Sequence, residues 1–533
     1  MMIWTLNKPK CLLRRTAKFY SLFMKQNHWL ILLIFFFSTV SAQPVSPNTP
    51  DFIRDSLDSY IQKGLNDWNL PGLSVVIVKD GQVVWMKGYG IRDVESRKPV
   101  DENTLFMIAS NTKLFTATSL ALLETQNKIS LNDPITRYFP TYRLYSEEST
   151  RLVSIRDMLS HHIGTKTYEG DFTFWNTALS REEVMRRMRY LKPPYHFRQE
   201  WGYCNSCFLT AGQVIQVVTG DSWEHFVQNH FLIPLAMSQT RILSTAVAEQ
   251  PNVATPYTTA YADHLTQVPY DNWNNLAPAA SIVSNVNDLS HWLFMQLDSG
   301  RYQGKQILDW TTISKTRMAN TWITSVKDSV YPTHFKGYGL GLFMADYAGR
   351  QIFWHTGGAG GMVSNVCFVP EEKLGIAILT NNDNQEFYED LRYQILDAYL
   401  GVPYVNRSLQ NLPDFLRKYE AQKTEINGWV ARVKNSQPEL PLSAYAGEYT
   451  NILYGKIHIS QQASHLLIHY DTKPDLSATL DYMDHGEWLL RYNNILYGVF
   501  KVQFAVSGGR VKSVSTLQNP YVEYDPYVFV KAD

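Results

Sequence analysis

The sequence predicts an α+β domain followed by a small all-β antiparallel barrel, and three observations support this. Helical spacing and a hairpin pattern follow one another between Asp51 and Glu124, so helices must pack on an antiparallel sheet. Two or three further strands follow one another between residues 352 and 381. From Leu442 to Val530 about eight short strands are separated by turn residues, a spacing typical of a small barrel.

The composition indicates a globular chain of 533 residues, which is longer than one ordinary core and predicts two domains. The formal net charge is zero, but the first 42 residues contain six basic residues and no acidic one. The remainder holds 43 basic and 49 acidic residues, a net charge of −6. A mildly acidic chain without a basic run argues against nucleic acid as a partner.

The N-terminal segment has the pattern of an export signal. An apolar stretch from Trp29 follows Lys25 and ends in Val40-Ser41-Ala42, small residues at the two positions that a signal peptidase reads. We therefore expect cleavage after Ala42 and a periplasmic or secreted protein. The apolar run is shorter than the ~20 residues of a membrane-spanning helix, so we expect no stable span after cleavage. Translation from Met24 instead of Met1 would also give an ordinary signal.

Three cysteines remain after such a cleavage, Cys204, Cys207 and Cys367. An odd number in an exported chain argues against a disulfide framework. The Cys-x-x-Cys spacing favours small buried side chains, with a local disulfide or a metal element as the alternatives. A zinc site needs about four ligands and no second pair is present, so we expect neither a metal nor a cofactor.

The first domain opens with a helix and a hairpin. Apolar residues between Asp51 and Trp68 recur at helical spacing, and Leu70-Pro71-Gly72 ends the helix. The next strands are joined by Asp80-Gly81, a pair that supplies the positive φ values of a tight turn.

Two later segments predict a short helix and the roof of a cleft. Residues 154–159 predict a short helix in which Ser154 and Asp157 form a capping arrangement. Residues 166–200 mix aromatic and charged side chains, and we expect them to roof a cleft.

The segment from Phe106 to Glu124 contains Ser110 and Lys113 at the start of an apolar helix. Residues three apart share a helix face, so the amine can reach the hydroxyl and activate a weak nucleophile. The helix N-terminus also favours an oxyanion beside Ser110. Ser-x-x-Lys is common by chance, and an N-cap serine with a solvated lysine is the alternative.

A second polar pair, Tyr203 and Asn205, precedes another apolar helix. In an extended segment both side chains point the same way, and a tyrosine near a lysine can titrate low enough to accept a proton. The alternative is a buried tyrosine beside a turn-forming asparagine.

The third polar feature, His355-Thr356-Gly357-Gly358, ends a predicted strand that runs into a glycine-rich turn. Glycine lets a backbone N–H approach a ligand closely, so this edge can supply an oxyanion donor and hold a substrate carboxylate or carbonyl. The alternative for His355 is a structural role.

The order of these three features resembles the serine β-lactamase and penicillin-binding-protein superfamily, in its class C-like branch of β-lactamases, esterases and D-amino-acid peptidases. The similarity extends from about Phe52 to Tyr399 and includes segments 158–165 and 278–284, with Ile163 and Ala280 departing from the family pattern. The resemblance implies helices on both sides of the antiparallel sheet and an all-helical subdomain.

The resemblance also implies catalytic roles. Ser110 would attack an acyl carbon, and Lys113 and Tyr203 would share the role of base. Asn205 would orient the substrate amide and Lys113.

Substrate binding is implied for His355, Thr356, Gly357 and Gly358, with the N–H groups of Ser110 and Gly358 as the oxyanion hole. His355 stands where penicillin-hydrolysing enzymes usually carry lysine, which favours a peptidase or esterase.

The expected domains are a signal peptide (1–42), a hydrolase domain (43–402), a helical linker (403–440) and a barrel domain (441–533). The barrel resembles the lipocalin-like module that is often attached to these hydrolases, with which it shares the opening Tyr445-Ala-Gly-Glu-Tyr449. Packing or homo-oligomer contacts are its expected role, and ligand binding or substrate gating is the alternative.

The function expected from these features is that of an exported serine hydrolase, without a metal or cofactor, acting through a Ser110 acyl-enzyme. Its substrate would be a small peptide, ester or β-lactam-like molecule, and a D-amino-acid peptidase or esterase fits best. A true β-lactamase is one alternative, and an inactive protein that binds cell-wall fragments is another. Three polar features together favour the enzyme, because a binding protein needs none of them.

Overall fold

The computed structural model describes residues 49–433 and 437–532. The predicted signal peptide lies outside the described residues, so export stays a prediction. Among the described residues, no helix has both the length and the apolarity needed to cross a bilayer.

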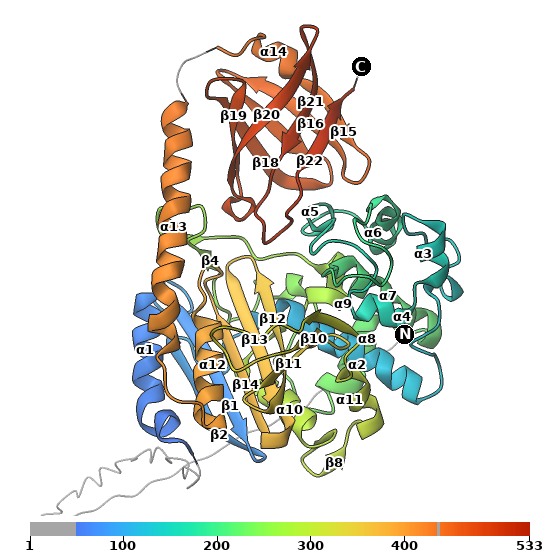
Figure 1. The fold of residues 1–533 in the computed structure, drawn as a ribbon, viewed down its shortest axis with the longest axis vertical. Helices are drawn as coiled ribbons and strands as arrows, with labels where there is room; N and C mark the ends of the chain where they lie inside the picture. Colours follow the sequence, from blue (N-terminus) through green and yellow to red (C-terminus); the bar gives the residue numbers. More distant parts are fainter. Residues whose placement is uncertain (1–48, 434–436, 533) are drawn as a thin grey trace, which may run out of the picture. The chain divides into compact units, whose positions relative to one another are not determined.

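An eight-stranded antiparallel sheet forms the centre of the first region, in the order β2-β1-β14-β13-β12-β11-β10-β9 (Figure 1). The predicted hairpin is confirmed, because β1 pairs with β2 and both Asp80 and Gly81 have positive φ angles, 51° and 78°. Strand β1 also pairs with β14, so the earliest and latest strands of the sheet are neighbours. The strands are β1 (Gly72–Lys79), β2 (Gln82–Gly90), β9 (Thr321–Thr324), β10 (Lys336–Tyr338), β11 (Phe343–Tyr347), β12 (Arg350–Ala359), β13 (Met362–Val369) and β14 (Leu374–Thr380).

Helices cover both faces of this sheet, as the resemblance implied (Figure 1). Residues Val75 and Ile77 of β1 point to one face, where α1 (Leu57–Asp67) and α12 (Phe387–Leu400) pack. Val76 and Val78 point to the other face and its separate core. The helices of that side are α2 (Thr112–Thr125), α10 (Val286–Leu297) and α11 (Trp310–Thr316). Burial on both faces explains why β1 is a continuous apolar run.

A helical subdomain packs beside α2. Its helices are α3 (Glu147–Leu152), α4 (Ile155–Leu159), α5 (Asp171–Phe174), α6 (Arg181–Arg187), α7 (Asn205–Thr219), α8 (Trp223–Val227) and α9 (Ala277–Ala280). The predicted capping box of α4 is confirmed, because the Ser154 N–H donates to Asp157 at 2.8 Å and Ser154 accepts from the Asp157 N–H. Helices α5 and α6 occupy the segment that the sequence left unassigned.

Short elements connect these layers. They include 3₁₀ turns at Ala109–Asn111, Ile135–Arg137, Met188–Tyr190 and Asn274–Leu276, and the paired strands β3 (Phe106–Met107) with β6 (Val283–Ser284), β4 (Tyr257–Thr258) with β5 (Thr266–Gln267), and β7 (Arg301–Tyr302) with β8 (Lys305–Gln306).

The C-terminal region is a closed barrel of eight antiparallel strands, which confirms the second part of the predicted fold class. Helix α13 (Arg407–Arg432) precedes it, and α14 (Leu442–Tyr445) lies at its start. Its strands are β15 (Gly447–Asn451), β16 (Gly455–Gln462), β17 (His465–Tyr470), β18 (Lys473–Tyr482), β19 (Glu487–Tyr492), β20 (Val499–Ser507), β21 (Arg510–Thr516) and β22 (Tyr527–Lys531). The barrel and the sheet region belong to one compact unit.

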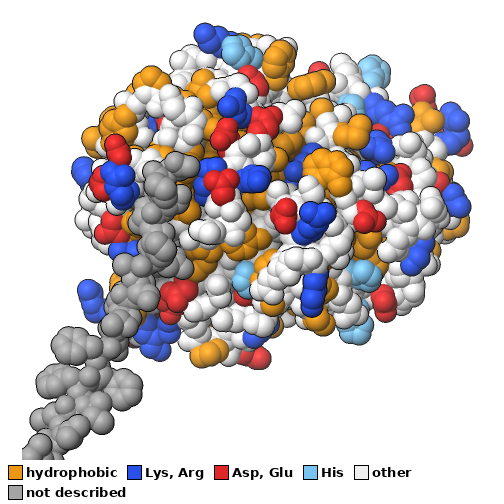
Figure 2. Space-filling view, turned by 90° about the horizontal axis from the view of Figure 1, so that it is seen from below, with side chains coloured by type: hydrophobic (Ala, Val, Ile, Leu, Met, Phe, Trp, Pro, Cys, Tyr) orange, Lys and Arg blue, Asp and Glu red, His pale blue; other side chains and the backbone are white. Residues whose placement is uncertain are grey.

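On the face seen in Figure 2, basic and acidic side chains are interspersed rather than separated into patches.

Candidate active site

Ser110 lies in a strained turn immediately before α2. The preceding residue, Ala109, has a φ of 47°, in the left-handed region that costs a non-glycine residue about 1–2 kcal/mol. The turn is tied to β13, because Ser364 Oγ donates to the Ile108 carbonyl at 2.7 Å and accepts from Asn111 Nδ2 at 2.8 Å. These contacts hold the turn, and the Ser110 hydroxyl lines the cavity.

Lys113 is completely buried, and its amine makes three polar contacts. Its Nζ lies 3.0 Å from Ser110 Oγ, 2.6 Å from Asn205 Oδ1 and 3.0 Å from the Ala279 carbonyl oxygen. Burial lowers the lysine pKa to about 7, against the opposing effect of the Asp171 carboxyl. A neutral amine has two N–H groups, and the two carbonyl oxygens accept them. Its lone pair is then left for the proton of Ser110.

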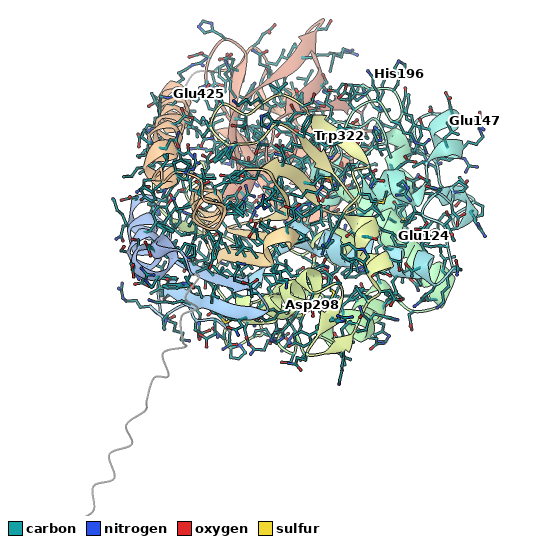
Figure 3. The ribbon with its side chains drawn as sticks, turned by 60° about the horizontal axis from the view of Figure 1, so that its bottom comes forward. Glu124, Glu147, His196, Asp298, Trp322 and Glu425 are labelled. Carbon is teal, nitrogen blue, oxygen red and sulfur yellow. The ribbon has the colours of Figure 1, made fainter. Side chains whose placement is uncertain are left out.

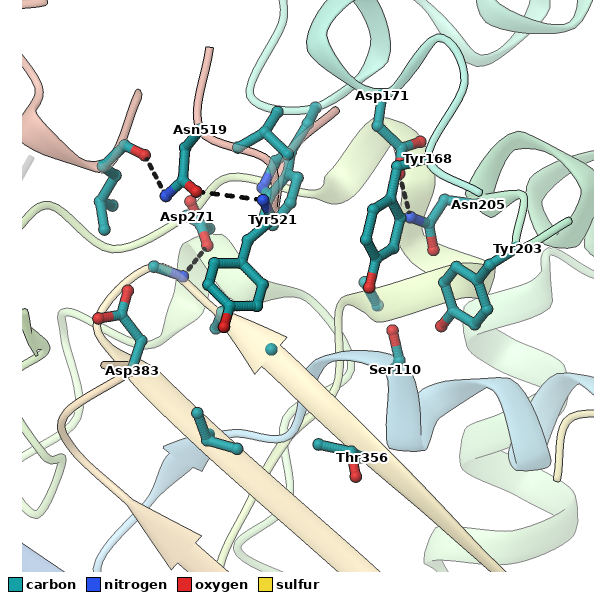
Figure 4. Close-up of a pocket in the computed structure, with 18 of the residues that line it drawn as sticks. Ser110, Tyr168, Asp171, Tyr203, Asn205, Asp271, Thr356, Asp383, Asn519 and Tyr521 are labelled. Atoms are coloured by element: carbon teal, nitrogen blue, oxygen red, sulfur yellow. Dashed lines mark hydrogen bonds between the residues drawn. The ribbon is translucent and has the colours of Figure 1, made fainter. Parts of the chain in front are cut away.

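Tyr203 is also buried, and its phenol points toward the Ser110 hydroxyl (Figure 4). Its ring lies 4.7 Å from the Lys113 amine. The prediction that its pKa is low is wrong: burial raises the pKa of Tyr203 well above its usual value, so the phenol stays protonated. Tyr203 is therefore suited to passing a proton on rather than to acting as a resident anion.

Asn205 does not lie in an extended segment, as the sequence suggested, but is the first residue of α7. Its side chain nevertheless points toward the same space as that of Tyr203 (Figure 4). While its oxygen accepts from Lys113, its Nδ2 donates to Asp171 Oδ2 at 2.6 Å. The asparagine thus connects the lysine to a carboxyl group of α5.

Sequence reasoning missed Asp171, which is only 1% exposed. Burial raises the pKa of this carboxyl well above its usual range. Within the described part of the chain, its second oxygen has no hydrogen-bond partner. The sequence pointed to Asp171 only through its place in segment 166–200, which was expected to roof a cleft, because no motif surrounds it.

His355 is only 2% exposed and takes part in a hydrogen-bond chain that sets its tautomer. Its Nδ1 lies 2.8 Å from the Thr356 carbonyl oxygen and must donate to it, so Nε2 accepts from the Tyr338 hydroxyl at 2.9 Å. His161 accepts the Cys204 N–H at Nδ1 and donates from Nε2 to Tyr338. Burial lowers the pKa of His355 to about 3, so the ring is neutral. Its contact with substrate stays a prediction, and it supplies no positive charge.

Gly357 and Gly358 lie near the end of β12, and the predicted glycine-rich turn follows at Gly360 and Gly361. A Cβ at Gly357 would lie 2.1 Å from the Ile108 carbonyl oxygen, so only glycine lets β12 pack against the Ser110 turn. A Cβ at Gly358 would meet no atom within 4 Å.

The neighbouring strand β11 pairs with β12 only as far as Trp354. Beyond that residue, the edge of β12 lies against the Ser110 turn, and Thr356 and Gly358 line the cavity. The Thr356 hydroxyl accepts from Asn365 Nδ2 at 2.9 Å.

The sequence-predicted residues meet around a cavity of about 450 Å³ (Figure 4). Its lining includes Ser110, Tyr203, Asn205, His355, Thr356 and Gly358, while Lys113 and Gly357 lie behind it. Aromatic side chains from the segment 166–200 also line it, which confirms the expected roof. The barrel contributes Leu496, Tyr497, Asn519, Tyr521 and Val522.

Carboxyl groups outnumber cations in this cavity. The lining acids are Asp171, Asp271, Asp383, Glu386 and Glu389, and Lys336 is the lysine among the lining residues. Asp271 and Asp383 accept the N–H groups of Gly360 and Gly361, and burial raises the pKa of each carboxyl to about 6. Such a lining disfavours an anionic ligand.

The three cysteines are buried and free, as favoured from the sequence. Among the residues that the structure describes, no cluster of three or more His, Cys, Asp or Glu side chains is arranged to hold a metal ion.

Comparison with protein families gives two matches. A family described as Beta-lactamase matches residues 57–400, more than half of the chain, and a domain of unknown function, DUF3471, matches residues 431–531. Curated relatives include the Unguisins hydrolase ungD of Aspergillus violaceofuscus, which is 26% identical over 81% of this chain and 80% of its own length. Protein flp of Staphylococcus aureus is 24% identical over 64% of this chain and 67% of its own length.

Solved structures share the fold. The octameric penicillin-binding protein homologue from Pyrococcus abyssi aligns with a TM-score of 0.57 and 21% identity, covering 89% of this chain and 99% of that one. A D-stereospecific amidohydrolase from Streptomyces sp. aligns with a TM-score of 0.52 and 22% identity, covering 64% of this chain and 97% of that one.

Proposed function

Because this chain belongs to the β-lactamase family, we propose that it is a serine hydrolase in which Ser110 forms an acyl-enzyme with an amide or ester substrate. One observation carries the proposal. The buried Lys113 amine lies 3.0 Å from Ser110 Oγ and also contacts Asn205 Oδ1 and the Ala279 carbonyl oxygen; in its neutral form it donates to these two oxygens, so its lone pair faces the Ser110 hydroxyl. This is the arrangement of a base beside the nucleophile that it activates.

In the proposed reaction, Ser110 Oγ bonds to the acyl carbon while its proton moves to the Lys113 amine. The N–H groups of Ser110 and Gly358 would stabilise the oxyanion, each contributing roughly 3–4 kcal/mol. The Tyr203 phenol then gives its proton to the leaving amine or alcohol as the bond to the acyl carbon breaks, and it regains a proton from Lys113. Water attacks the ester in the second half, along the same proton path in reverse.

The cavity supports a peptidase or esterase rather than a dedicated β-lactamase. A β-lactam carries a carboxylate, and the neutral His355 and the acidic lining offer it little attraction. One relative is named a hydrolase and one structural neighbour a D-stereospecific amidohydrolase, which agrees with amide cleavage. Turnover of D-amino-acid amides or short esters, with nitrocefin left intact, is the expected outcome of a substrate panel. Rapid nitrocefin turnover would favour the β-lactamase.

Covalent labelling tests the nucleophile. We expect a fluorophosphonate probe to modify wild-type protein at Ser110, located by peptide mass spectrometry, and Ser110→Ala to take up no label, because the variant lacks the attacking oxygen. The variant replaces a small hydroxyl by hydrogen, so its unfolding temperature should match that of the wild type. A folded wild type that is not labelled would instead support the binding protein.

The pH dependence of labelling tests the base. Only neutral Lys113 accepts a proton, so the rate constant should rise by about tenfold between pH 6 and pH 8, as pH passes the lysine pKa of about 7. The titratable groups around the amine are Asp171, Cys204 and Cys207, together with Tyr203, His161 and His355. Of these, His161 and His355 are held neutral by burial. A rate constant that does not change between pH 6 and pH 8 would contradict a base with this lowered pKa.

A further inference from the structure

The barrel encloses a side chain from the hydrolase region. Phe172 of α5 is fully buried among barrel aromatics, and its ring lies within 5.2–6.3 Å of five tyrosine rings. These are Tyr454, Tyr470, Tyr492, Tyr497 and Tyr527. The space that a lipocalin-like module would offer a ligand next to these tyrosines is thus taken by Phe172.

Glu523, in the loop between β21 and β22, holds the start of α5. It is 3% exposed, and its two oxygens accept the N–H groups of Gly170 at 2.9 Å and Phe172 at 3.0 Å. The Tyr527 hydroxyl donates to the same carboxyl at 2.9 Å. Both carboxyl oxygens of Glu523 therefore accept hydrogen bonds, and they bind the backbone of the two residues on either side of Asp171.

The far end of the same segment is also attached to the barrel. The Ala178 N–H donates to the Thr472 carbonyl at 2.8 Å, and the buried Lys473 amine donates to the Trp175 carbonyl. The α5 segment is thus held at both ends by barrel residues that lie 351 and 298 positions further along the chain.

Asp171 connects the α5 segment to the proposed catalytic residues through hydrogen bonds. Its carboxyl accepts from Asn205 Nδ2, and Asn205 Oδ1 accepts from the Lys113 amine. Figure 4 shows the Asn205–Asp171 hydrogen bond directly above Ser110 and Tyr203, with Tyr521 of the barrel loop across the cavity. We propose that Glu523 is a positioning residue of the hydrolase site: by fixing α5, it makes Asp171 hold Asn205 against Lys113. This rests on the proposed function of Ser110 and Lys113.

The proposal gives the barrel a direct part in catalysis. A displaced Asp171 would leave Asn205 free to rotate, and the Lys113 lone pair would lose its alignment with Ser110. The expected signature is slower acylation of Ser110.

The test compares Glu523→Gln with Asp525→Asn, a matched control on the same loop that removes only an exposed ion pair with Lys166. The glutamine side chain can accept only one of the N–H groups of Gly170 and Phe172, because its NH₂ group would face the other. We expect Glu523→Gln to slow labelling of Ser110 by about tenfold to a hundredfold, the cost of a ~1 Å misplacement, and Asp525→Asn to leave it unchanged. Equal rates in both variants would overturn the proposal.

A double-variant cycle separates positioning from general loss of stability. If Glu523 acts through Asp171, then Glu523→Gln combined with Asp171→Asn should label no more slowly than Asp171→Asn alone. If the double variant labels more slowly than Asp171→Asn, by the factor that Glu523→Gln shows alone, the proposal is overturned.

Hydrogen exchange provides a readout that does not depend on activity. Glu523→Gln should speed exchange in peptides covering residues 170–178 and 203–207, which exclude Lys166, while Asp525→Asn should not. Unchanged exchange there would overturn the positioning role, whereas a wild type that never labels would contradict only the proposed function.

Discussion

Lys113→Met is expected to slow acylation of Ser110 by about 10³-fold, within the range that general bases contribute. Methionine keeps the length and the apolar contacts of the buried stem but has no lone pair for the Ser110 proton and no N–H for Asn205. The rate constant for fluorophosphonate labelling measures the loss. Protein that labels at the wild-type rate would show that Lys113 is not the base.

Two further variants sharpen this result. Lys113→Arg keeps a positive charge, but a guanidinium stays protonated at neutral pH, so it should label about as slowly as Lys113→Met. Activity retained by the arginine variant would mean that charge, not basicity, matters. Lys315→Met is the control, because Lys315 pairs with Glu124 at the far end of α2, where Figure 3 labels the glutamate. Its rate should stay within about twofold of the wild type.

Gly357→Ala is expected to lower the free energy of unfolding by about 3 kcal/mol, the upper end of the usual cost of overpacking. The new methyl group would lie 2.1 Å from the Ile108 carbonyl oxygen and 2.4 Å from Ser364 Oγ, the pair that holds the Ser110 turn. Because one of these atoms belongs to the backbone, relief requires β12 or the turn to move. Denaturant unfolding and Ser110 labelling should therefore both be impaired.

Gly358→Ala is the matched control, since it adds the same methyl group one residue later. No atom lies within 4 Å of that Cβ, and the residue is exposed to the cavity. Its free energy of unfolding should stay within about 0.5 kcal/mol of the wild type, although the methyl narrows the substrate space. Equal stability of the two variants would contradict the close packing inferred at Gly357.

The contact between Ser110 and Lys113 could be predicted from the sequence, but the pKa of Tyr203 could not. Ser110 and Lys113 meet because residues three apart on a helical turn must share a face. The low pKa expected for Tyr203 failed for a reason that no motif shows. A neighbouring positive charge lowers the pKa of a phenol and burial raises it, and at Tyr203 the effect of burial is the larger.

Helical periods, the Asp80-Gly81 turn, the capping box and the series of strands are local patterns, so the amino-acid order alone was enough to anticipate both folds and the spacing of the reactive side chains. The roles of Asp171 and Glu523 were beyond such patterns, because Glu523 lies 353 positions from Gly170 and meets it only when the barrel closes on α5. The lysine pKa likewise depends on the removal of water from all sides of one amine. Desolvation and long-range contact arise from packing, and therefore only the folded chain determines them.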